Sequence, residues 1–546
     1  MRADIIRVYK SVHTWTGILS GMALFIAFYA GSITVFKEPL TRWASPPTVS
    51  SVVPIADAQE LIVKTLDVHP AAAKEFRIHL QEAEHLPARM GWQIRTPDAD
   101  DHDIFSMRHY VAQLDGNGLA SVQESHPSQL AEFIDVLHRV VGLPVDNDPS
   151  RWFMGVVAVL YTLALVSGVI VLLPSLVKDF FAVRVGKNLK RMWLDAHNVV
   201  GIVSLPFHLV IALTAVVFAF HDEIYFVQNK MLHDSKMTSA FQAPQAAPGT
   251  ASQRDPAKML APAELVARVR SLSPGFEPST LQYQHVTGPR AVVRVWGKDA
   301  TAVMPRARGG FAAIDPYSGK VINSDYLPGK QSTPSLIISS FFALHMAAFG
   351  GTPVQWMYFL LGLGGAWLFF SGNLLWIESR RRRAPRGSDG VPIQSLPTRL
   401  MASASVGVCL GCVCGISLMI VGSKWLHGQV SHLNDWHRIL YYGMFFASIG
   451  WAFLRGAARA AVHLLWLAAA VSLAIPMTTL LTWLVPTLGL WAHTSAATLG
   501  VDATAFAGAL CFAWMARATS RRIWHGEAID SVWSAREPTS PDIPSC

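Results

Sequence analysis

The sequence is poor in charged residues and in cysteine. Only 15% of its 546 residues are Asp, Glu, Lys or Arg, whereas 51% are hydrophobic. It has five cysteines, and none of them lies in the two long polar segments, 40–127 and 222–333, so no disulfide framework is predicted there. This balance excludes an ordinary soluble enzyme and indicates a membrane protein.

A dinucleotide-binding motif is also lacking. No Gly-x-Gly-x-x-Gly follows a strand and opens a helix, as the phosphate-binding turn of that fold requires. Gly362, Gly364 and Gly365 lie inside an apolar run, where close packing between helices explains them better. The sequence therefore does not predict a dinucleotide bound by the chain itself.

Long hydrophobic runs are plentiful, and several exceed the roughly 20 residues that cross a bilayer. We predict about eight membrane helices, at 15–36, 152–173, 199–220, 356–377, 402–421, 439–453, 462–485 and 501–515. The first run is too long for a signal-peptide core and has no small-residue cleavage site after it, so a retained helix is expected. None of the runs is visibly broken and charged in its middle, as transport sites tend to be.

Basic residues mark one side of this membrane arrangement. They gather before the first run, at 178–191, at 380–386, at 455–459 and at 517–522. Because Lys and Arg stay in short cytoplasmic connections, both termini are predicted inside, with 40–127 and 222–333 outside in the periplasm. The net charge of +8 then reflects topology and contact with anionic lipid, and no nucleic-acid partner is expected.

The two polar segments share one order of elements, which predicts two small α+β domains. Each begins with a helix, continues with three strands and ends in a turn. In the first segment these are 56–66, then 76–80, 91–95 and 110–114, and the turn 115–118. In the second they are 262–272, then 281–286, 291–296 and 311–314, and the turn 315–321, after a linker at 240–257.

Histidines repeat with the same order. His13 and His197 each open an apolar run, while His138 and His345 each lie on a short amphipathic helix that follows a polar segment. The chain is thus predicted to contain two half-repeats, followed by four further membrane helices. The expected parts are 1–39, 40–127 and 128–175, then 192–221, 222–333 and 334–378, then 400–516 and a cytoplasmic tail at 517–546.

If the halves pack about a pseudo-twofold axis normal to the membrane, His13 faces His197 near the inner surface and His138 faces His345 near the outer one. A neutral imidazole in lipid needs a partner for its nitrogens. Each pair could hold one haem by two axial imidazoles, which favours electron transfer over oxygen chemistry. The alternative is that these are buried helix histidines, hydrogen-bonded to backbone, Ser or Thr.

His208 is an alternative axial or relay residue. It follows His197 by 11 residues, which on a straight helix returns to within about 20° of the same face, roughly 16.5 Å further along. Its counterpart in the first half is Leu24, so it ranks below the four repeated histidines, and a core histidine is the other interpretation. His221, beside Asp222, is expected to be an interface residue.

Two further groups are weaker candidates for a metal site. Cys409, Cys412 and Cys414 lie in the fifth run, where buried apolar cysteines are the simpler interpretation because a metal site normally needs four ligands. His427, His432, Asp435 and His437 surround the connection between the fifth and sixth runs, where a solvated loop is expected.

Together, the segment around His13-Thr14-Trp15-Thr16-Gly17, Ala196-His197 through Pro206 to Thr214, Leu137-His138-Arg139 and the turn 315–321 resemble the PepSY-associated transmembrane proteins of bacterial iron uptake. The resemblance covers about 1–380, and the turn 115–118 looks like a degraded form of the later one. Within that family the chain resembles FoxB-type ferric-siderophore reductases of the inner membrane. The resemblance implies two b-type haems and iron reduction on the periplasmic side.

The expected function is thus that of a di-haem oxidoreductase acting on a ferric siderophore, with hydroxamate chelates favoured. Hard oxygen ligands hold ferric iron far more tightly than ferrous iron, so one electron releases the metal. A quinol or a cytoplasmic flavoprotein would supply that electron. The alternatives are an iron-chelate permease, and a membrane-anchored regulator whose outer domains restrain a protease or sensor.

Overall fold

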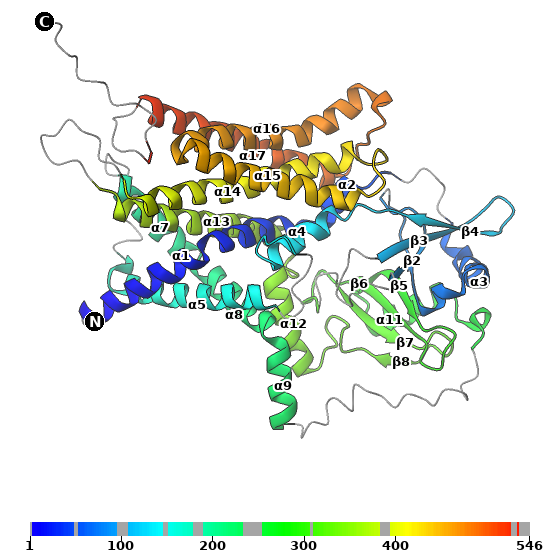
Figure 1. Ribbon diagram of the computed structural model, residues 1–546. Helices are drawn as coiled ribbons and strands as arrows, with labels where there is room; N and C mark the ends of the chain where they lie inside the picture. Colours follow the sequence, from blue (N-terminus) through cyan, green and yellow to red (C-terminus); the bar gives the residue numbers. More distant parts are fainter. Residues whose placement is uncertain are drawn as a thin grey trace, which may run out of the picture. The chain divides into compact units, whose positions relative to one another are not determined.

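The computed structural model describes residues 3–47, 53–83, 85–95, 107–145, 151–177, 189–232, 254–305, 309–382, 394–525 and 532–533. They form two compact units. The helical unit comprises Met1–Ala44, Ser128–Ala212 and Phe359–Cys546, and the sheet unit comprises Ser45–Pro127 and Leu213–Tyr358. Figure 1 shows both with their elements labelled.

Several sequence-based predictions fall largely or wholly outside the described residues. They concern the linker at 240–257, the tail beyond 525, and the basic residues Arg2, Lys178, Arg184, Lys187, Arg383 and Arg386. These predictions are left as they stand.

Six helices of the described residues are long and apolar enough to cross a membrane. They are α1 (Ala3–Thr34), α5 (Trp152–Leu172), α13 (Gly351–Arg380), α14 (Leu396–Trp425), α16 (Ala457–Leu484) and α17 (Ala496–His525). The expected sixth run forms a full helix, α15 (Leu433–Arg455), but it is less apolar because Asn434, Asp435, His437 and Arg438 occupy its first turns. The described chain thus shows six spans, or seven if a bent pair counts as one.

That bent pair is the expected third run, which we predicted as one straight helix. It consists of α7 (Leu189–Val203) and α8 (Leu205–Ala219), which meet at an angle of 68°. Pro206 explains the bend, because its ring clashes with the carbonyl of the preceding turn and it has no N–H to donate. This run is therefore broken, but no Asp, Glu, Lys or Arg lies at the break, so the prediction that no run is both broken and charged in its middle is not contradicted. The placement of His208 on the His197 face by straight-helix geometry is wrong.

Small residues bring α13 against α1 in the helical unit. A Cβ at Gly362 would lie 2.3 Å from Oγ of Ser32, and a Cβ at Gly365 would lie 2.5 Å from the ring of Phe28. Both distances are too short for a side chain, so the two helices approach each other at these glycines. The interpretation of this glycine cluster as a packing motif is confirmed.

The sheet unit contains one antiparallel sheet of eight strands in the order β4-β3-β2-β1-β5-β6-β7-β8. Both predicted outer segments contribute four strands, and β1 pairs with β5 at the centre. The strands are β1 (Glu75–His79), β2 (Met90–Arg95), β3 (Met107–Leu114), β4 (Ala120–Ser125), β5 (Glu277–Gln284), β6 (Val292–Lys298), β7 (Gly310–Ile314) and β8 (Val321–Asn323).

This shared sheet modifies the expectation of two separate small domains. The predicted helices are present as α3 (Ala58–Val68) and α11 (Pro262–Leu272), and one core of buried residues from both segments includes Leu61, Phe76 and Tyr283. Pairing β1 with β5 satisfies an edge that each four-stranded half would otherwise expose. The two segments therefore form one folded unit.

The two turns at the sheet edges have the same construction. In the first, Asp115 Oδ1 accepts from the backbone N–H groups of Asn117 and Leu119, and in the second Asp315 Oδ1 accepts from Tyr317 and Ser318. Each turn contains a glycine with φ near +70°, Gly118 or Gly319, a conformation that glycine adopts without strain. The first turn thus keeps the capping aspartate and the glycine of the second, although it is one residue shorter.

Short helices connect these parts. They are α2 (Lys37–Ala44), α4 (Leu130–Arg139), α9 (His221–Leu232) and α12 (Thr333–Met346), with 3-10 turns at Ile55–Asp57, Pro70–Lys74, Leu173–Ser175, Pro256–Lys258 and Pro486–Leu488. The two histidine-bearing helices, α4 and α12, both end in left-handed residues, at Val141 and Ala347. The short helices predicted to carry His138 and His345 are thus present.

Candidate functional site

The five candidate histidines lie on five different helices. His13 is on α1, His138 on α4, His197 on α7, His208 on α8 and His345 on α12. The first four belong to the helical unit and His345 to the sheet unit. Each group is therefore described within its own unit.

His13 and His197 face each other across the helical unit. Their ring centres are 6.5 Å apart and the ring planes make an angle of 74°. An imidazole nitrogen binds a metal at about 2.0–2.1 Å, so two imidazoles on opposite sides of one ion place their ring centres roughly 6 Å apart. The spacing of this pair fits two axial ligands of a single iron.

All five rings use the same nitrogen, Nδ1, for a hydrogen bond to another element. Two of the partners are backbone carbonyl oxygens: Ala164 O lies 2.8 Å from Nδ1 of His13, and Ala27 O lies 2.7 Å from Nδ1 of His138. The other three are hydroxyl oxygens: Ser371 Oγ lies 2.9 Å from Nδ1 of His197, Tyr161 Oη 2.6 Å from that of His208, and Thr214 Oγ1 2.9 Å from that of His345. A carbonyl only accepts, so in His13 and His138 the proton sits on Nδ1 and the lone pair on Nε2. This is the orientation in which a second hydrogen bond prepares histidine for a metal.

The anchoring groups follow the repeat. Ala164 of α5 holds His13, and Ser371 of α13 holds His197. The same number of residues separates Ala164 from Ser371 as separates His138 from His345. The structure therefore relates the two halves through the partners of the histidines as well as through the histidines themselves.

Glycines leave room beside both His13 and His197. Gly17 and Gly201 lie four residues after His13 and His197, on the same helix face one turn further. A Cβ at either glycine would meet no heavy atom of the described chain within 4 Å. A flat ring bound between the two imidazoles needs such space, so these residues fit a porphyrin.

Ser371 and Asn373 are polar residues of this site that we did not identify from the sequence. Asn373 is 1% exposed and neither polar atom of its amide has a hydrogen-bond partner. Gly372, between them, lies against His197. Polar side chains in the middle of an apolar run are costly and usually functional, and that signal would have found both.

His208 lies in an aromatic enclosure within the helical unit. Its ring centre is 5.5 Å from Phe28 and 6.4 Å from Phe369. The side chain is 3% exposed and Nε2 has no hydrogen-bond partner. Although the helical-spacing argument for His208 failed, this buried, unpartnered nitrogen keeps it a candidate ligand.

His138 is held where α4 crosses α1. A Cβ at Gly31 would lie 2.8 Å from its ring, so only glycine permits this approach. Nearby, burial would raise the pKa of Asp135, but the charges of Lys37 and Arg139 outweigh it and hold that pKa below its usual value. The ring therefore lies beside a carboxylate that stays ionised.

His345 has a comparable place in the sheet unit. Its ring centre is 5.0 Å from Phe218 of α8, in an edge-on arrangement, and its Nδ1 partner, Thr214, lies one turn earlier on the same helix. In each half the short histidine helix thus packs on the first long helix of that half. The pairing of His138 with His345 remains a prediction.

The other candidate sites do not gather ligands. No group of three or more His, Cys, Asp or Glu residues in the described chain is arranged to hold a metal ion. Cys409, Cys412 and Cys414 are buried free thiols. His437 is 1% exposed inside α15, so the expectation of a solvated loop is wrong for that residue.

The sequence matches no curated protein. Residues 10–379 match the family described as PepSY-associated TM region. The match includes all five histidines and both polar segments and ends before α14. Since it covers more than half of the chain, the protein belongs to the PepSY-associated TM region family.

Proposed function

We propose that this protein is a di-haem b reductase of the bacterial inner membrane that reduces ferric siderophore iron at the periplasmic side. The observation that carries the proposal is the pair His13 and His197, with ring centres 6.5 Å apart and Nδ1 of each ring fixed by a neighbouring helix. The open faces at Gly17 and Gly201 support it.

The residues of this pair would hold and orient a haem. Ala164 and Ser371 fix the two rings, and the buried amide of Asn373 is a hydrogen-bonding group available to a polar substituent. Haem supplies one-electron chemistry between ferric and ferrous iron. Ligation by the two imidazoles of His13 and His197 would favour electron transfer over oxygen chemistry.

A second haem is proposed on His138, with His345 as its other ligand and His208 as the alternative. All three use Nδ1 in a hydrogen bond. In the proposed orientation both termini are cytoplasmic, α7–α8 and α15 complete eight spans, and the sheet unit lies in the periplasm as a pair of PepSY-like domains.

The proposed reaction is a one-electron reduction. A quinol or a cytoplasmic flavoprotein is oxidised, and each electron converts one chelated ferric ion to a ferrous ion. No acid, base or nucleophile of the chain is needed. Hydroxamate oxygens bind the ferrous ion much more weakly, so the iron leaves the siderophore.

A reduced-minus-oxidised visible spectrum of the detergent-purified protein tests the proposal, with pyridine-haemochrome quantitation of haem per chain. We expect six-coordinate b-type bands at about two haems per chain, and reoxidation when a ferric hydroxamate is added. A colourless protein would refute the proposal.

Single substitutions then assign the ligands. His13→Ala or His197→Ala should remove one haem, and His138→Ala the other. Comparing His345→Ala with His208→Ala identifies the fourth ligand. His463→Ala is the matched control, because this α16 histidine bonds Trp451 of α15 outside the proposed site.

The permease alternative gains one observation, the bend between α7 and α8, since broken helices line transport sites. It does not explain why His13 and His197 face each other with anchored rings. Uptake of labelled iron chelate into proteoliposomes without a reductant would favour the permease. Recovery of a protease or sensor with a colourless protein would favour the regulator.

A further inference from the structure

The last four helices, α14–α17, follow the part of the chain that matches the family, and the repeat gives them no role. Within the helical unit they pack on one another, and α14 and α15 also contact α4. Their polar contacts with α4 and α2 are few and specific, and they suggest what these helices do.

The start of α4 and the segment just beyond its end are bonded to α15. At its start, the backbone N–H of Gln129 donates to Oδ1 of Asn434 at 2.9 Å. Beyond its end, the carbonyl of Leu143 accepts from the hydroxyl of Tyr442 at 2.7 Å. The Gln129 N–H is one of the backbone groups that the start of a helix leaves without an intrahelical partner, whereas Leu143 belongs to the segment that follows α4. Helix α15 therefore holds the start of α4 and the segment just beyond its end.

An aromatic contact fills the interval between these bonds. The ring of Phe133, on the buried face of α4, meets Tyr441 edge-on at 5.9 Å and Tyr442 at 6.0 Å. Edge-to-face pairs add about 0.5–1.5 kcal/mol beyond burial. Together with the terminal hydrogen bonds they determine where α4 sits along α15.

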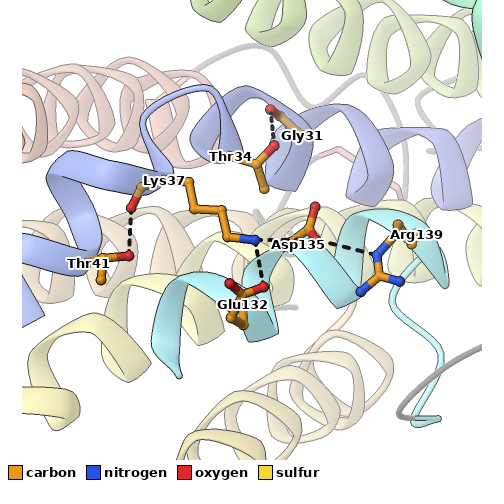
Figure 2. A network of polar contacts seen from close by, with 7 residues as sticks. All are labelled: Gly31, Thr34, Lys37, Thr41, Glu132, Asp135 and Arg139. Atoms are coloured by element: carbon orange, nitrogen blue, oxygen red, sulfur yellow. Dashed lines mark hydrogen bonds and ion pairs between the residues drawn. The ribbon is translucent and has the colours of Figure 1, made fainter. Parts of the chain in front are cut away.

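The opposite face of α4 is held by α2, as Figure 2 shows. Nζ of Lys37 lies 2.6 Å from Oε2 of Glu132 and 3.5 Å from Oδ2 of Asp135, which also pairs with Arg139 at 3.4 Å. His138 lies next to Arg139 on this helix. The ion pairs therefore fix the turn of α4 that carries the histidine.

Helices α14 and α17 in turn hold α2. Nε1 of Trp43 donates to Oδ1 of Asp502 at 2.9 Å, and Nζ of Lys424 lies 3.7 Å from the centre of the Trp43 ring. Trp43 is 1% exposed. The helix that supplies Lys37 is thus clamped by the C-terminal helices.

In the second half, the histidine-bearing helix α12 is held by a residue of the repeat itself. The hydroxyl of Tyr358, on α13, donates to the carbonyl of Leu344, the residue before His345, at 2.7 Å. That tyrosine belongs to the repeat itself. In the first half the tyrosine comes from α15, which explains why α4 needs helices outside the repeat.

We propose that α14–α17 form a brace that positions the His138 helix, with α15 holding the start of α4 and the segment just beyond its end, and with α14 and α17 holding α2 and its Lys37. Asn434 and Tyr442 are then positioning residues for His138. The consequence for electron transfer rests on the proposed function, because it requires His138 to bind haem, whereas the placement of α4 does not.

The test compares the full-length double variant Asn434→Leu/Tyr442→Phe with the wild-type protein by amide hydrogen exchange of residues 129–145. Each lost hydrogen bond should raise local opening about fivefold. The electron paramagnetic resonance signal and midpoint potential of one haem should shift while those of the other stay constant. Asn434→Asp/Tyr442→Phe keeps an acceptor for Gln129 and should restore the part of both changes that comes from position 434.

Two controls separate the brace from general loosening. Tyr358→Phe removes the equivalent hydrogen bond from α13 to α12 and should leave exchange in α4 unchanged, and so should Leu454→Ala on the exposed face of α15. Wild-type exchange in α4 of the double variant would overturn the brace. Faster exchange in α4 of the double variant, together with a wild-type protein that contains no haem, would support the brace and refute the proposed reductase.

Discussion

At the scale of single residues, the open space beside His13 and His197 supports the proposed haem site as much as the two histidines do. A Cβ placed on Gly17 or Gly201 would have no neighbouring heavy atom within 4 Å in the described chain, yet glycine inside a helix costs about 1 kcal/mol relative to alanine. A bound ring that needs the space accounts for that cost.

We therefore predict that Gly17→Leu lowers haem content from two to one per chain without lowering helix stability. The leucine side chain would occupy the space of the ring, and the helix would gain up to about 1 kcal/mol from the loss of glycine. Haem quantitation and hydrogen exchange of α1 measure the two effects.

Gly443→Leu is the matched control, because Gly443 of α15 also has open space around its Cα but lies away from the histidines in the sequence repeat. It should keep both haems. If Gly17→Leu kept two haems per chain, the open space beside Gly17 would not be the site of the ring, and lipid or helix packing would explain it.

A second prediction at this scale concerns His79 in β1. Burial, together with the charges of Arg77, His85 and Arg89, lowers its pKa to about 4. The folded chain thus binds this proton less readily than the unfolded chain, whose pKa is about 6.5. Stability from this group is fully present above pH 6.5, falls as the pH drops toward 4, and is lost below it.

Local opening free energies of β1, measured by hydrogen exchange at pH 7.5 and pH 5, should differ by on the order of 2 kcal/mol from this group, after allowance for its partial exposure. His79→Gln should remove that part of the difference. An unchanged pH dependence in the variant would contradict the lowered pKa.

The residues of the site around His13 and His197 could be predicted only in part. The repeat around His13 and His197 was visible in the sequence because both open an apolar run. Ser371 and Asn373 were not identified, since a helix position alone does not say which neighbour a polar group meets. The spacing of His208 misled, because the proline bend changed the direction of the helix between it and His197.

At the scale of elements, one stripe of small residues decides how α14 meets α15. A Cβ at Gly407 would lie 2.8 Å from Cα of Ile449, at Gly411 3.0 Å from the carbonyl of Phe445, and at Gly415 3.0 Å from that of Tyr441. These contacts are with backbone, which cannot move aside without shifting the helix.

Gly411→Val should therefore separate the two helices and destabilise the pair by about 1–3 kcal/mol, the usual cost of overpacking. Hydrogen exchange of α14 and α15 in detergent measures it. Gly450→Val, on α15 with open space, should stay within about 0.5 kcal/mol, and equal effects of both would argue against the close contact.

The elements were more predictable than their partners. Strands β1–β3 and β5–β7, helices α3 and α11, and most spans lie close to their predicted positions, because period-two and long apolar patterns are local signals. The edge strands β4 and β8 were missed. The pairing of β1 with β5 was missed too, since pairing between distant segments leaves no mark in local periodicity.

At the scale of the whole chain, the part that matches the family contacts the C-terminal helices α14–α17 at α2. Lys424 is 1% exposed, and its Nζ donates to the carbonyl of Trp491 at 3.1 Å. Asp502 accepts from Trp43 and from Thr479 at 3.1 Å. A buried cation and a buried carboxylate thus lie on either side of one tryptophan from the N-terminal part.

We predict that Lys424→Met and Asp502→Asn each destabilise the helical unit by about 1–3 kcal/mol, because each removes a hydrogen-bonded charge from this buried cluster and its electrostatic attraction to the other charge. The double variant should be less damaged than the sum of the singles, with a coupling energy of at least about 1 kcal/mol. Arg455→Met removes an exposed cation beside Trp451 and should change stability by about 0.5 kcal/mol or less. Equilibrium unfolding in mixed detergent measures the stability of all four variants. Strictly additive losses would show that the two charges act independently. In that case they would not join the C-terminal helices to α2 as one unit.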